Sequence, residues 1–537
     1  MRKSAKRHAV MPGRLLTVVT ATVATVLALG TVIGVGGKAS AGTQSGLPGD
    51  QKAVPHETRC IERYAADPQN NYVNWWPAIA APEHTDAIHS GTQPCATFAA
   101  SFRKGTHDVN SFVSPQGQWP DIGFVVFDGP NAGYLLGGNL NTDTGQFVAK
   151  FDPSTGQQIW KTTLINVYDQ TPVQWIAFGS LGIQKNGFLY AAAGPTIWKL
   201  DRNTGQIVAK EQQTIQEIPP TDANLDGFGV APDANGTILM KTQNRPVGCT
   251  IQGNGAITQC QAEFGPPADT TVIAADPNTL QTLASIQLNQ HIAGRPVITK
   301  HDGKIYMYLT GASTLVRIIW NPSNNTLTQD SSWAPDYLLP GQSNGAAPVV
   351  LGNWVIANEN ALGGSVPQCA VAVSQDDPNN LHRLCPWGST LPAGVPSSEQ
   401  PASYGIDTAN SMIYAQDVFV NGAFGIRLNQ DTGNMTVVWS RPDWRTGDYF
   451  SLEGPANKRV IFSQYISPNF QFSQWDALTY TESVLWANAA TGQTLAQSAY
   501  NPSTAQGSLP NIGYAGRAYL MGNDGRLYLY EPTGKDG

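Results

Sequence analysis

The residues best suited to chemistry stand at 222–227, where the chain reads Asp222-Ala-Asn224-Leu-Asp226-Gly. Oxygen-bearing side chains at alternate positions can converge on one Ca²⁺, and the glycine allows the sharp bend of such a loop. Asp233 falls at the twelfth position, where the EF-hand pattern has Glu. A Pro-Pro pair just before the loop rules out a long entering helix. The stretch is therefore either a Ca²⁺ site or an Asp/Asn-rich turn that holds no ion.

The element that positions this loop is a repeated strand–turn–strand unit. In Phe147–Trp160, apolar residues alternate, the turn Asp-Pro-Ser-Thr-Gly reverses the chain, and a return strand begins at Ile159. We count eight copies of this turn, which begin at Asp152, Asp201, Asp276, Asn321, Ser374, Asn429, Asn488 and Glu531. Repeats of roughly 40–50 residues with four short strands each are typical of a β-propeller. The prediction is an all-β fold, an eight-bladed β-propeller over residues 116–537.

The first strand of each blade lines the central channel of a propeller, and ligands bind at its mouth. The predicted starts of these strands carry polar and aromatic side chains, which make a funnel suited to a sugar, a polyol or a metal. The alternative is a water-filled channel with satisfied polar walls. The funnel candidates are Asp121, Trp175, Asp226, Arg295, Asn344, Ser403, Glu453 and Asn511.

The first 41 residues have the pattern of a signal peptide. A basic start precedes an apolar run from Leu15 to Val35, and Ala39-Ser-Ala41 is an A-x-A cleavage site. An uncleaved membrane anchor is the alternative. We expect cleavage, secretion and a mature chain without a membrane span. The net charge of −7 argues against a nucleic-acid partner, which needs a basic surface.

Six cysteines in a secreted chain favour disulfides. Their spacing suggests the local pairs Cys60 with Cys95, Cys249 with Cys260, and Cys369 with Cys385, although six cysteines allow fifteen pairings. The pair at 249 and 260 lies in an insertion of the third repeat, around 243–267, which we interpret as a stapled loop on a blade edge rather than a ninth blade.

Residues 42–115 lack the repeat and form an irregular N-terminal arm. The last repeat stops at its turn, because only three residues follow Gly534. An open ring would leave unpaired strand edges. We therefore expect the arm to supply the missing outer strand, from either Val109–Val113 or Asn71–Trp76.

The recurring Asp-x-x-Thr-Gly-x-x-x-Trp pattern over about 119–537 resembles the repeat of the pyrroloquinoline quinone (PQQ)-type propellers. That superfamily includes quinoprotein alcohol dehydrogenases and the non-enzymatic propeller of outer-membrane assembly, and it implies an eight-bladed ring. This chain departs from the dehydrogenases, since it has no adjacent Cys-Cys pair and no haem-binding Cys-x-x-Cys-His. The resemblance therefore leaves PQQ without a supporting motif and implies no haem.

These observations favour a secreted, monomeric binding or scaffold protein with a protein, small-molecule or carbohydrate ligand at the funnel. The alternative is a quinoprotein-like alcohol or sugar dehydrogenase that uses the same funnel. The sequence contains no H-E-x-x-H or phosphate-loop motif. His84 and His89 lie in the arm, and the lone His291 near Arg295 is interpreted as structural.

Overall fold

The computed structural model describes residues 46–67, 70, 72–102, 107–120, 123–138, 145–169, 173–251, 256–361, 364–400, 402–475, 477–504 and 510–534. These residues belong to one compact unit, Ser45–Gly537. The expected signal peptide and Asp121 lie outside the described residues. Within the described part of the chain, no helix is both long and apolar enough to cross a membrane.

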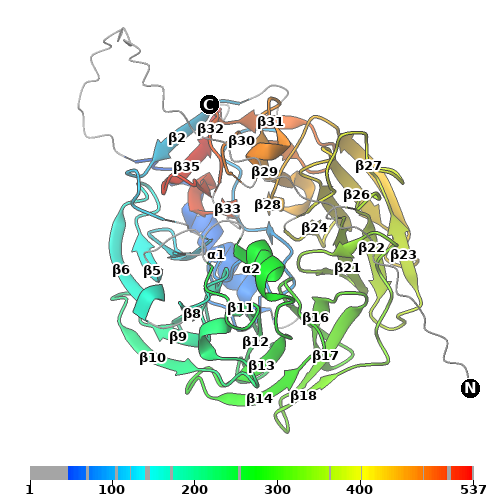
Figure 1. Cartoon of the computed structure of the whole chain (residues 1–537). Helices are drawn as coiled ribbons and strands as arrows, with labels where there is room; N and C mark the ends of the chain where they lie inside the picture. The colour runs from blue at the N-terminus through cyan, green and yellow to red at the C-terminus, as the bar shows by residue number, and fades with distance from the viewer. Residues whose placement is uncertain are drawn as a thin grey trace, which may run out of the picture. The chain divides into compact units, whose positions relative to one another are not determined.

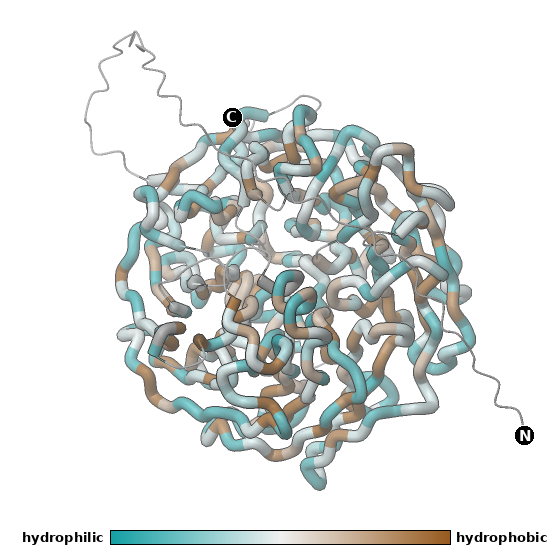
Figure 2. The backbone as a smooth tube through the Cα atoms, in the orientation of Figure 1, coloured by the Kyte–Doolittle hydropathy of each residue, from teal (hydrophilic) through white to brown (hydrophobic). Residues whose placement is uncertain are grey.

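The described strands form eight sheets, which are the blades of a β-propeller (Figure 1). The first strands of successive blades contact one another around the ring. The predicted all-β, eight-bladed fold is therefore confirmed. Figure 2 shows hydrophobic and hydrophilic residues alternating along the outer strands, as expected when only one side of such a strand is covered.

The first four blades follow the order of the chain. Blade 1 comprises β3 (Phe124–Gly129), β4 (Ala132–Gly137), β5 (Gln146–Phe151) and β6 (Gln158–Ile165). Blade 2 comprises β7 (Ser180–Ile183), β8 (Leu189–Ala193), β9 (Thr196–Leu200) and β10 (Ile207–Gln212). Blade 3 comprises β11 (Leu225–Val230), β12 (Ile238–Thr242), β13 (Thr271–Ala275) and β14 (Thr282–Gln287). Blade 4 comprises β15 (Val297–His301), β16 (Lys304–Thr310), β17 (Leu315–Asn321) and β18 (Thr326–Gln329).

Of the next three blades, blades 5 and 7 carry small additions. Blade 5 comprises β19 (Ser343–Asn344), β20 (Val349–Leu351), β21 (Trp354–Asn360), β22 (Ala370–Ser374) and β23 (Leu381–Leu384). Blade 6 comprises β24 (Gly405–Asp407), β25 (Met412–Gln416), β26 (Ala423–Leu428) and β27 (Met435–Arg441). Blade 7 comprises β28 (Ser451–Glu453), β29 (Val460–Ile466), β30 (Thr481–Asn488), β31 (Thr494–Gln497) and β32 (Asn501–Pro502), and β1 (Thr92–Gln93) of the arm joins it.

Blade 8 is built from both ends of the chain. It comprises β33 (Asn511–Ile512), β34 (Ala518–Met521), β35 (Leu527–Pro532) and, as its outer strand, β2 (Val109–Val113) of the arm. The antiparallel register of β2 on β35 runs from Val109 opposite Pro532 to Val113 opposite Tyr528. The arm segment beside residues 527–532 is thus one of the two that the sequence suggested.

The repeated turn is held by hydrogen bonds between neighbouring residues, as its sequence predicts. The Oδ1 atom of Asp152 accepts the N–H groups of Ser154 (2.7 Å) and Thr155 (3.2 Å), and the N–H of Gly156 donates to the Asp152 carbonyl (2.7 Å). Gly156 has a φ of +65°, which glycine adopts without a Cβ clash. The same arrangement recurs at Asp201. These turns connect the third strand of a blade to the fourth.

Two tryptophans join a blade to the turn of the next blade. The Nε1–H of Trp439 in blade 6 donates to the carbonyl of Ala489 in blade 7 (2.9 Å). Trp354 in blade 5 donates likewise to Gln430 in blade 6 (2.9 Å). A buried Trp removes ~150–250 Å² from water, so these contacts contribute strongly to the association of neighbouring blades.

Strand direction defines two faces of the ring. Connections between first and second strands, and between third and fourth strands, lie on one face, here called the turn face. Connections between second and third strands, and between blades, lie on the other, here called the crossover face. The helix α1 (Val54–Ala66) contacts the short turn 514–516 between β33 and β34, which places it on the turn face. The helix α2 (Ala256–Phe264) belongs to the connection from β12 to β13, on the crossover face.

All three predicted disulfides are present: Cys60–Cys95, Cys249–Cys260 and Cys369–Cys385. Cys60 lies in α1, so the first bond ties this helix to the arm segment just after β1. The second closes the insertion of blade 3, which is a stapled loop as predicted. Disulfides of this kind are typical of proteins outside the cytosol.

Candidate functional site

The ring axis is occupied by the arm, along residues 79–93. Backbone N–H groups of first strands donate to arm carbonyls: Phe127 to Ala80, Ile183 to Ala81, Ile298 to Ala87, Ile406 to Ser90 and Leu452 to Gly91, at 2.8–2.9 Å. These donors come from blades 1, 2, 4, 6 and 7. β1 then runs parallel to β28, with Thr92 opposite Leu452. The first strands of these blades therefore face the arm here, where the sequence suggested an open funnel.

The arm enters from the turn face and folds back on itself. The side-chain amide of Asn74 donates to the carbonyls of Ala231 and Asp233 (both 2.8 Å), in the turn after β11. Glu83 reaches the start of β7, where its carboxylate accepts Ser180 Oγ (3.2 Å) and the N–H of Leu181 (3.3 Å). The tip of the arm, residues 83–89, therefore lies toward the crossover face.

A buried ion-pair network holds this tip. Arg295, which precedes β15, contacts the carboxylate of Glu83 and that of Asp226 in β11 (3.1 Å). Asp226 also pairs with Lys241 of β12 (Nζ–Oδ2 3.2 Å). Burial raises the pKa of Glu83 to about 7, and the Arg295 guanidinium opposes that rise. Burial also lowers the pKa of Lys241, against the attraction of Asp226. The structure thus brings the candidates Asp226 and Arg295 together, around a glutamate that the sequence did not single out.

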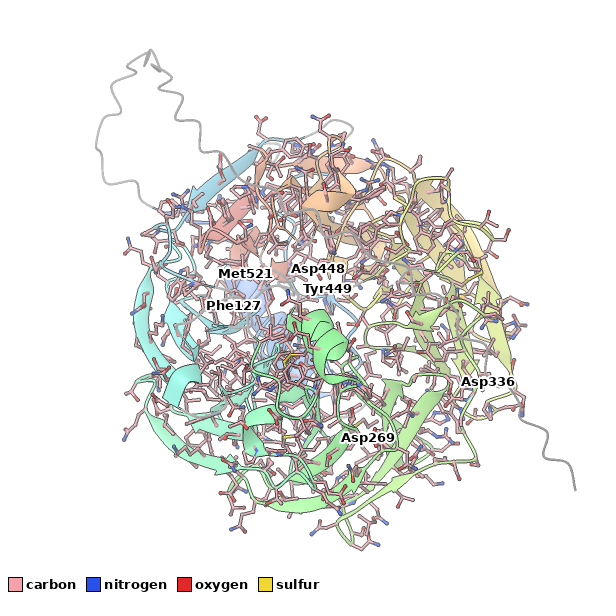
Figure 3. All side chains as sticks on the ribbon, in the orientation of Figure 1. Phe127, Asp269, Asp336, Asp448, Tyr449 and Met521 are labelled. Carbon is pink, nitrogen blue, oxygen red and sulfur yellow. A yellow bond between two sulfur atoms is a disulfide. The ribbon has the colours of Figure 1, made fainter. Side chains whose placement is uncertain are left out.

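Two histidines lie beside this network. The ring centroids of His84 and His89 are 4.3 Å apart, and His84 stacks on Tyr449 (5.2 Å, 9° between planes). Figure 3 places Tyr449 and its neighbour Asp448 near the centre of the ring. Burial lowers the pKa of His89 to about 3 and that of His84 well below its usual range. Both imidazoles are therefore neutral, and neither Nδ1 has a hydrogen-bond partner among the described residues.

The backbone at the tip is strained. His84, Thr85 and His89 have φ values of +57°, +70° and +55°, in the left-handed region that non-glycine residues rarely adopt. Such conformations cost of order 1–3 kcal/mol each and persist where the surroundings impose them. Sequence reasoning passed over these histidines because the arm has no repeat to predict that they reach the axis.

The remaining funnel candidates do not gather at one point. Trp175 is buried and donates to the carbonyl of Gln243 (2.9 Å). With His291 it lines a cavity of about 10 Å³, which is room for one water. Asn344 pairs with Glu359 in the β19–β21 ladder. Ser403, Glu453 and Asn511 are buried, and burial raises the pKa of Glu453 well above its usual range.

The four residues of the proposed Ca²⁺ loop face different partners. Asp222 pairs with Arg245 (2.7 Å), and Asp226 pairs with Lys241 and Arg295 as above. Asp233 accepts the Nε1–H of Trp320 (2.9 Å), and the amide of Asn224 donates to the carbonyl of Leu225 (3.2 Å). The Ca²⁺ site stays a prediction. If the loop holds Ca²⁺, a chelator should lower the melting temperature of the protein. Asn224→Ala should remove that effect.

Three metal-ligating side chains gather elsewhere, on the turn face. Within the described ranges, His301, Asp302 and Asp376 are the group of His, Cys, Asp and Glu residues whose ligand atoms all lie within 4.8 Å of one another. His301 Nε2 lies 2.7 Å from Asp376 Oδ1, and both aspartates are exposed. A hydrogen bond between a histidine and an aspartate at the surface has this same distance without a metal ion.

The stapled loop, residues 243–267, carries α2, which Figure 1 draws in front of the ring centre. Its side chains include exposed apolar groups: Val247 is 55% and Phe264 is 46% exposed. The expectation from sequence was a loop at a blade edge. The loop instead packs inward, because Arg245 within it pairs with Asp222 and Trp175 lies under Gln243.

No protein-family model matches the chain, and no curated protein matches it in sequence. Among solved structures, the quinohemoprotein alcohol dehydrogenase from Comamonas testosteroni matches with a TM-score of 0.50 and 11% identity, over 90% of this chain and 84% of that one. The quinohemoprotein alcohol dehydrogenase ADHIIG from Pseudomonas putida HK5 matches with a TM-score of 0.40 and 10% identity, over 89% and 82%. BamB from Moraxella catarrhalis matches with a TM-score of 0.40 and 11% identity, over 81% and 99%. Likeness at such identity concerns the fold alone, and it shows that this chain is an eight-bladed β-propeller with solved neighbours among the PQQ-like propellers.

Proposed function

We propose that this protein is a secreted binding or scaffold propeller whose ligand or partner contacts the central mouth on the crossover face. The observation that carries the proposal is the buried network of Glu83, Arg295, Asp226 and Lys241. The charged groups of this network pair with one another and hold the arm in place. A catalytic centre would instead need such groups free to contact a substrate.

The stapled loop supports an interaction at this mouth. A disulfide restricts the loop, and a preorganised loop loses little conformational entropy on binding. Its exposed Val247 and Phe264 are the kind of apolar side chain that a partner can cover.

The alternative, a quinoprotein-like dehydrogenase, needs an axis that can receive a flat quinone with several carboxylates. The residues present do not fit that group. Arg295 already holds two carboxylates, and arm residues 79–93 bond to the first strands of five blades. The cysteines form three bonds between residues 11 to 35 positions apart, so no adjacent pair faces the axis.

Site-specific photo-crosslinking tests the proposal. A benzophenone amino acid at position 264 should give a discrete crosslinked product with a protein or glycan from the producing cells. The same group at position 208, an exposed apolar site on the outer strand β10, is the matched control and should give none. Equal crosslinking at both positions would contradict the proposal that a partner contacts the central mouth. Dye-linked oxidation of alcohols or sugars after addition of PQQ and Ca²⁺ would favour the dehydrogenase instead.

A further inference from the structure

A second cavity lies between blades 6 and 7, away from the axis. It has a volume of about 280 Å³. Its wall includes the turn between β24 and β25, the turn between β28 and β29, and the turn after β30. All three are connections on the turn face, so the cavity opens opposite the stapled loop. It is therefore independent of the proposed partner at the central mouth.

Among the described residues, the charged ones that line this cavity are all cations: Arg427, Lys458 and Arg459. Arg459 is buried and bonded to Asp407 (Nε–Oδ2 3.0 Å), so it belongs to the framework. Arg427 and Lys458 are exposed, and neither makes an ion pair with another described residue. Two uncommitted cations at one cavity of a chain with a net charge of −7 create a local positive potential that attracts an anion.

The rest of the wall is suited to a hydroxylated ring. Tyr414, Met412 and Phe102 provide aromatic and apolar surface. Asn457 and Asn488 add side-chain amides, each of which can donate to and accept from hydroxyl groups. The cavity is slightly smaller than typical ligand pockets, which run from about 300 to 1,000 Å³. These dimensions suit one sugar-sized molecule.

We propose that this cavity binds a small hydroxylated anion of monosaccharide size, through charge-assisted hydrogen bonds from Arg427 and Lys458. A sugar acid and a sugar phosphate share the required chemistry, because either presents an anionic group beside ring hydroxyls. An arginine can hold a carboxylate or a phosphate through two parallel N–H bonds, whereas the lysine adds a point charge.

Isothermal titration calorimetry of the full mature protein tests the site, with glucuronate, glucose 6-phosphate, neutral glucose and inorganic phosphate as separate probes. At least one of the first two should bind more tightly than both glucose and phosphate. Arg427→Gln and Lys458→Gln should each raise its Kd about tenfold or more, since each removes a charge-assisted hydrogen bond to the anion. Added salt should weaken the binding, because the cations are exposed.

Lys304→Gln is the matched control, since it removes an exposed cation from β16, far along the ring. Its Kd should equal that of the unmodified protein. Melting curves establish that each variant is folded. The proposal is overturned if neither anionic sugar binds the folded protein, if glucose binds as tightly as glucuronate, or if Lys304→Gln weakens binding as much as Arg427→Gln does.

Discussion

Glu83 and Arg295 form a buried ion pair although 212 positions separate them in the chain. The pair joins the arm to blade 4, and Asp226 of blade 3 shares the same guanidinium. Removing one member of a buried pair leaves a charge without its partner, which costs ~3–5 kcal/mol. We therefore expect Arg295→Met to lower the melting temperature markedly in calorimetry.

The double variant Glu83→Gln/Arg295→Met should recover part of this loss, because it removes the stranded carboxylate together with the cation. Arg526→Met provides a control, since its pair with Asp524 is at the surface (Nε–Oδ2 3.6 Å) and such pairs contribute ~0–1 kcal/mol. A double variant as unstable as the sum of the single variants would show that the two groups are not coupled.

The neutral histidines predict a loss of stability in acid. His89 has a folded-state pKa of about 3, below its ordinary 6.5, and burial also lowers the pKa of His84, with a contribution from Arg295. Below pH 6.5 the unfolded chain therefore binds protons that the folded chain does not. For His89 the stabilisation is present above pH 6.5 and is lost as the pH falls toward 3, by about 1.4 kcal/mol per pH unit, and His84 contributes a loss of the same sign.

His89→Asn should flatten the dependence of the melting temperature on pH between 7 and 5, and Asn accepts the positive φ of this position. His56→Asn, at an exposed position of α1, should leave the dependence unchanged. An unaltered slope in His89→Asn would mean that other groups cause the acid sensitivity.

The contact between blades 6 and 7 predicts an intolerant glycine. A Cβ added at Gly492 would lie 2.7 Å from Cε3 of Trp439, and φ there is +69°. Gly492→Ala should therefore destabilise the protein by both clash and strain, by about 1–3 kcal/mol. Gly117→Ala tests the strain alone, since φ is +71° there and no atom of the described residues lies within 4 Å of the added Cβ. Equal melting temperatures for the two variants would contradict the clash.

The blades could be predicted because their cause is local. The carboxylate of Asp152 bonds to N–H groups two and three residues later, so the turn is visible in any copy of the motif. The same local logic applies to Cys249 and Cys260, which lie 11 positions apart. Because the turn recurs eight times in the sequence, the eight copies together predict eight blades of one propeller.

The path of the arm could not be predicted, because its partners are distant and its bonds use the backbone. The N–H of Ile406 donates to the carbonyl of Ser90, and no side-chain pattern in either segment predicts that bond. The ion pairs of Asp222 with Arg245 and of Asp226 with Arg295 could not be predicted for a related reason. The spacing of the two aspartates contains no information on the arginines, whose positions depend on the folded ring.

The composite blade predicts that the arm stabilises the whole ring. β2 provides the outer strand of blade 8, and Trp119, which follows it, donates its Nε1–H to the carbonyl of Gly156 in blade 1 (3.0 Å). The segment thus covers one strand edge and joins the last blade to the first. Without it, β35 would expose an unpaired edge. Deleting residues 42–115 should therefore destabilise the entire propeller.

A substitution within β2 makes this test sharper than the deletion. Ser111 stands opposite Tyr530 in the β2–β35 ladder. Ser111→Pro removes a backbone N–H and fixes φ at about −65°, away from the strand value, so it should distort β2, whereas Ser111→Ala keeps the backbone bonds. We expect the proline variant to melt at a lower temperature in a single transition, because separating blades 8 and 1 opens the ring for every blade. Two separate transitions, with the main one unchanged, would show that the arm closes only its own blade.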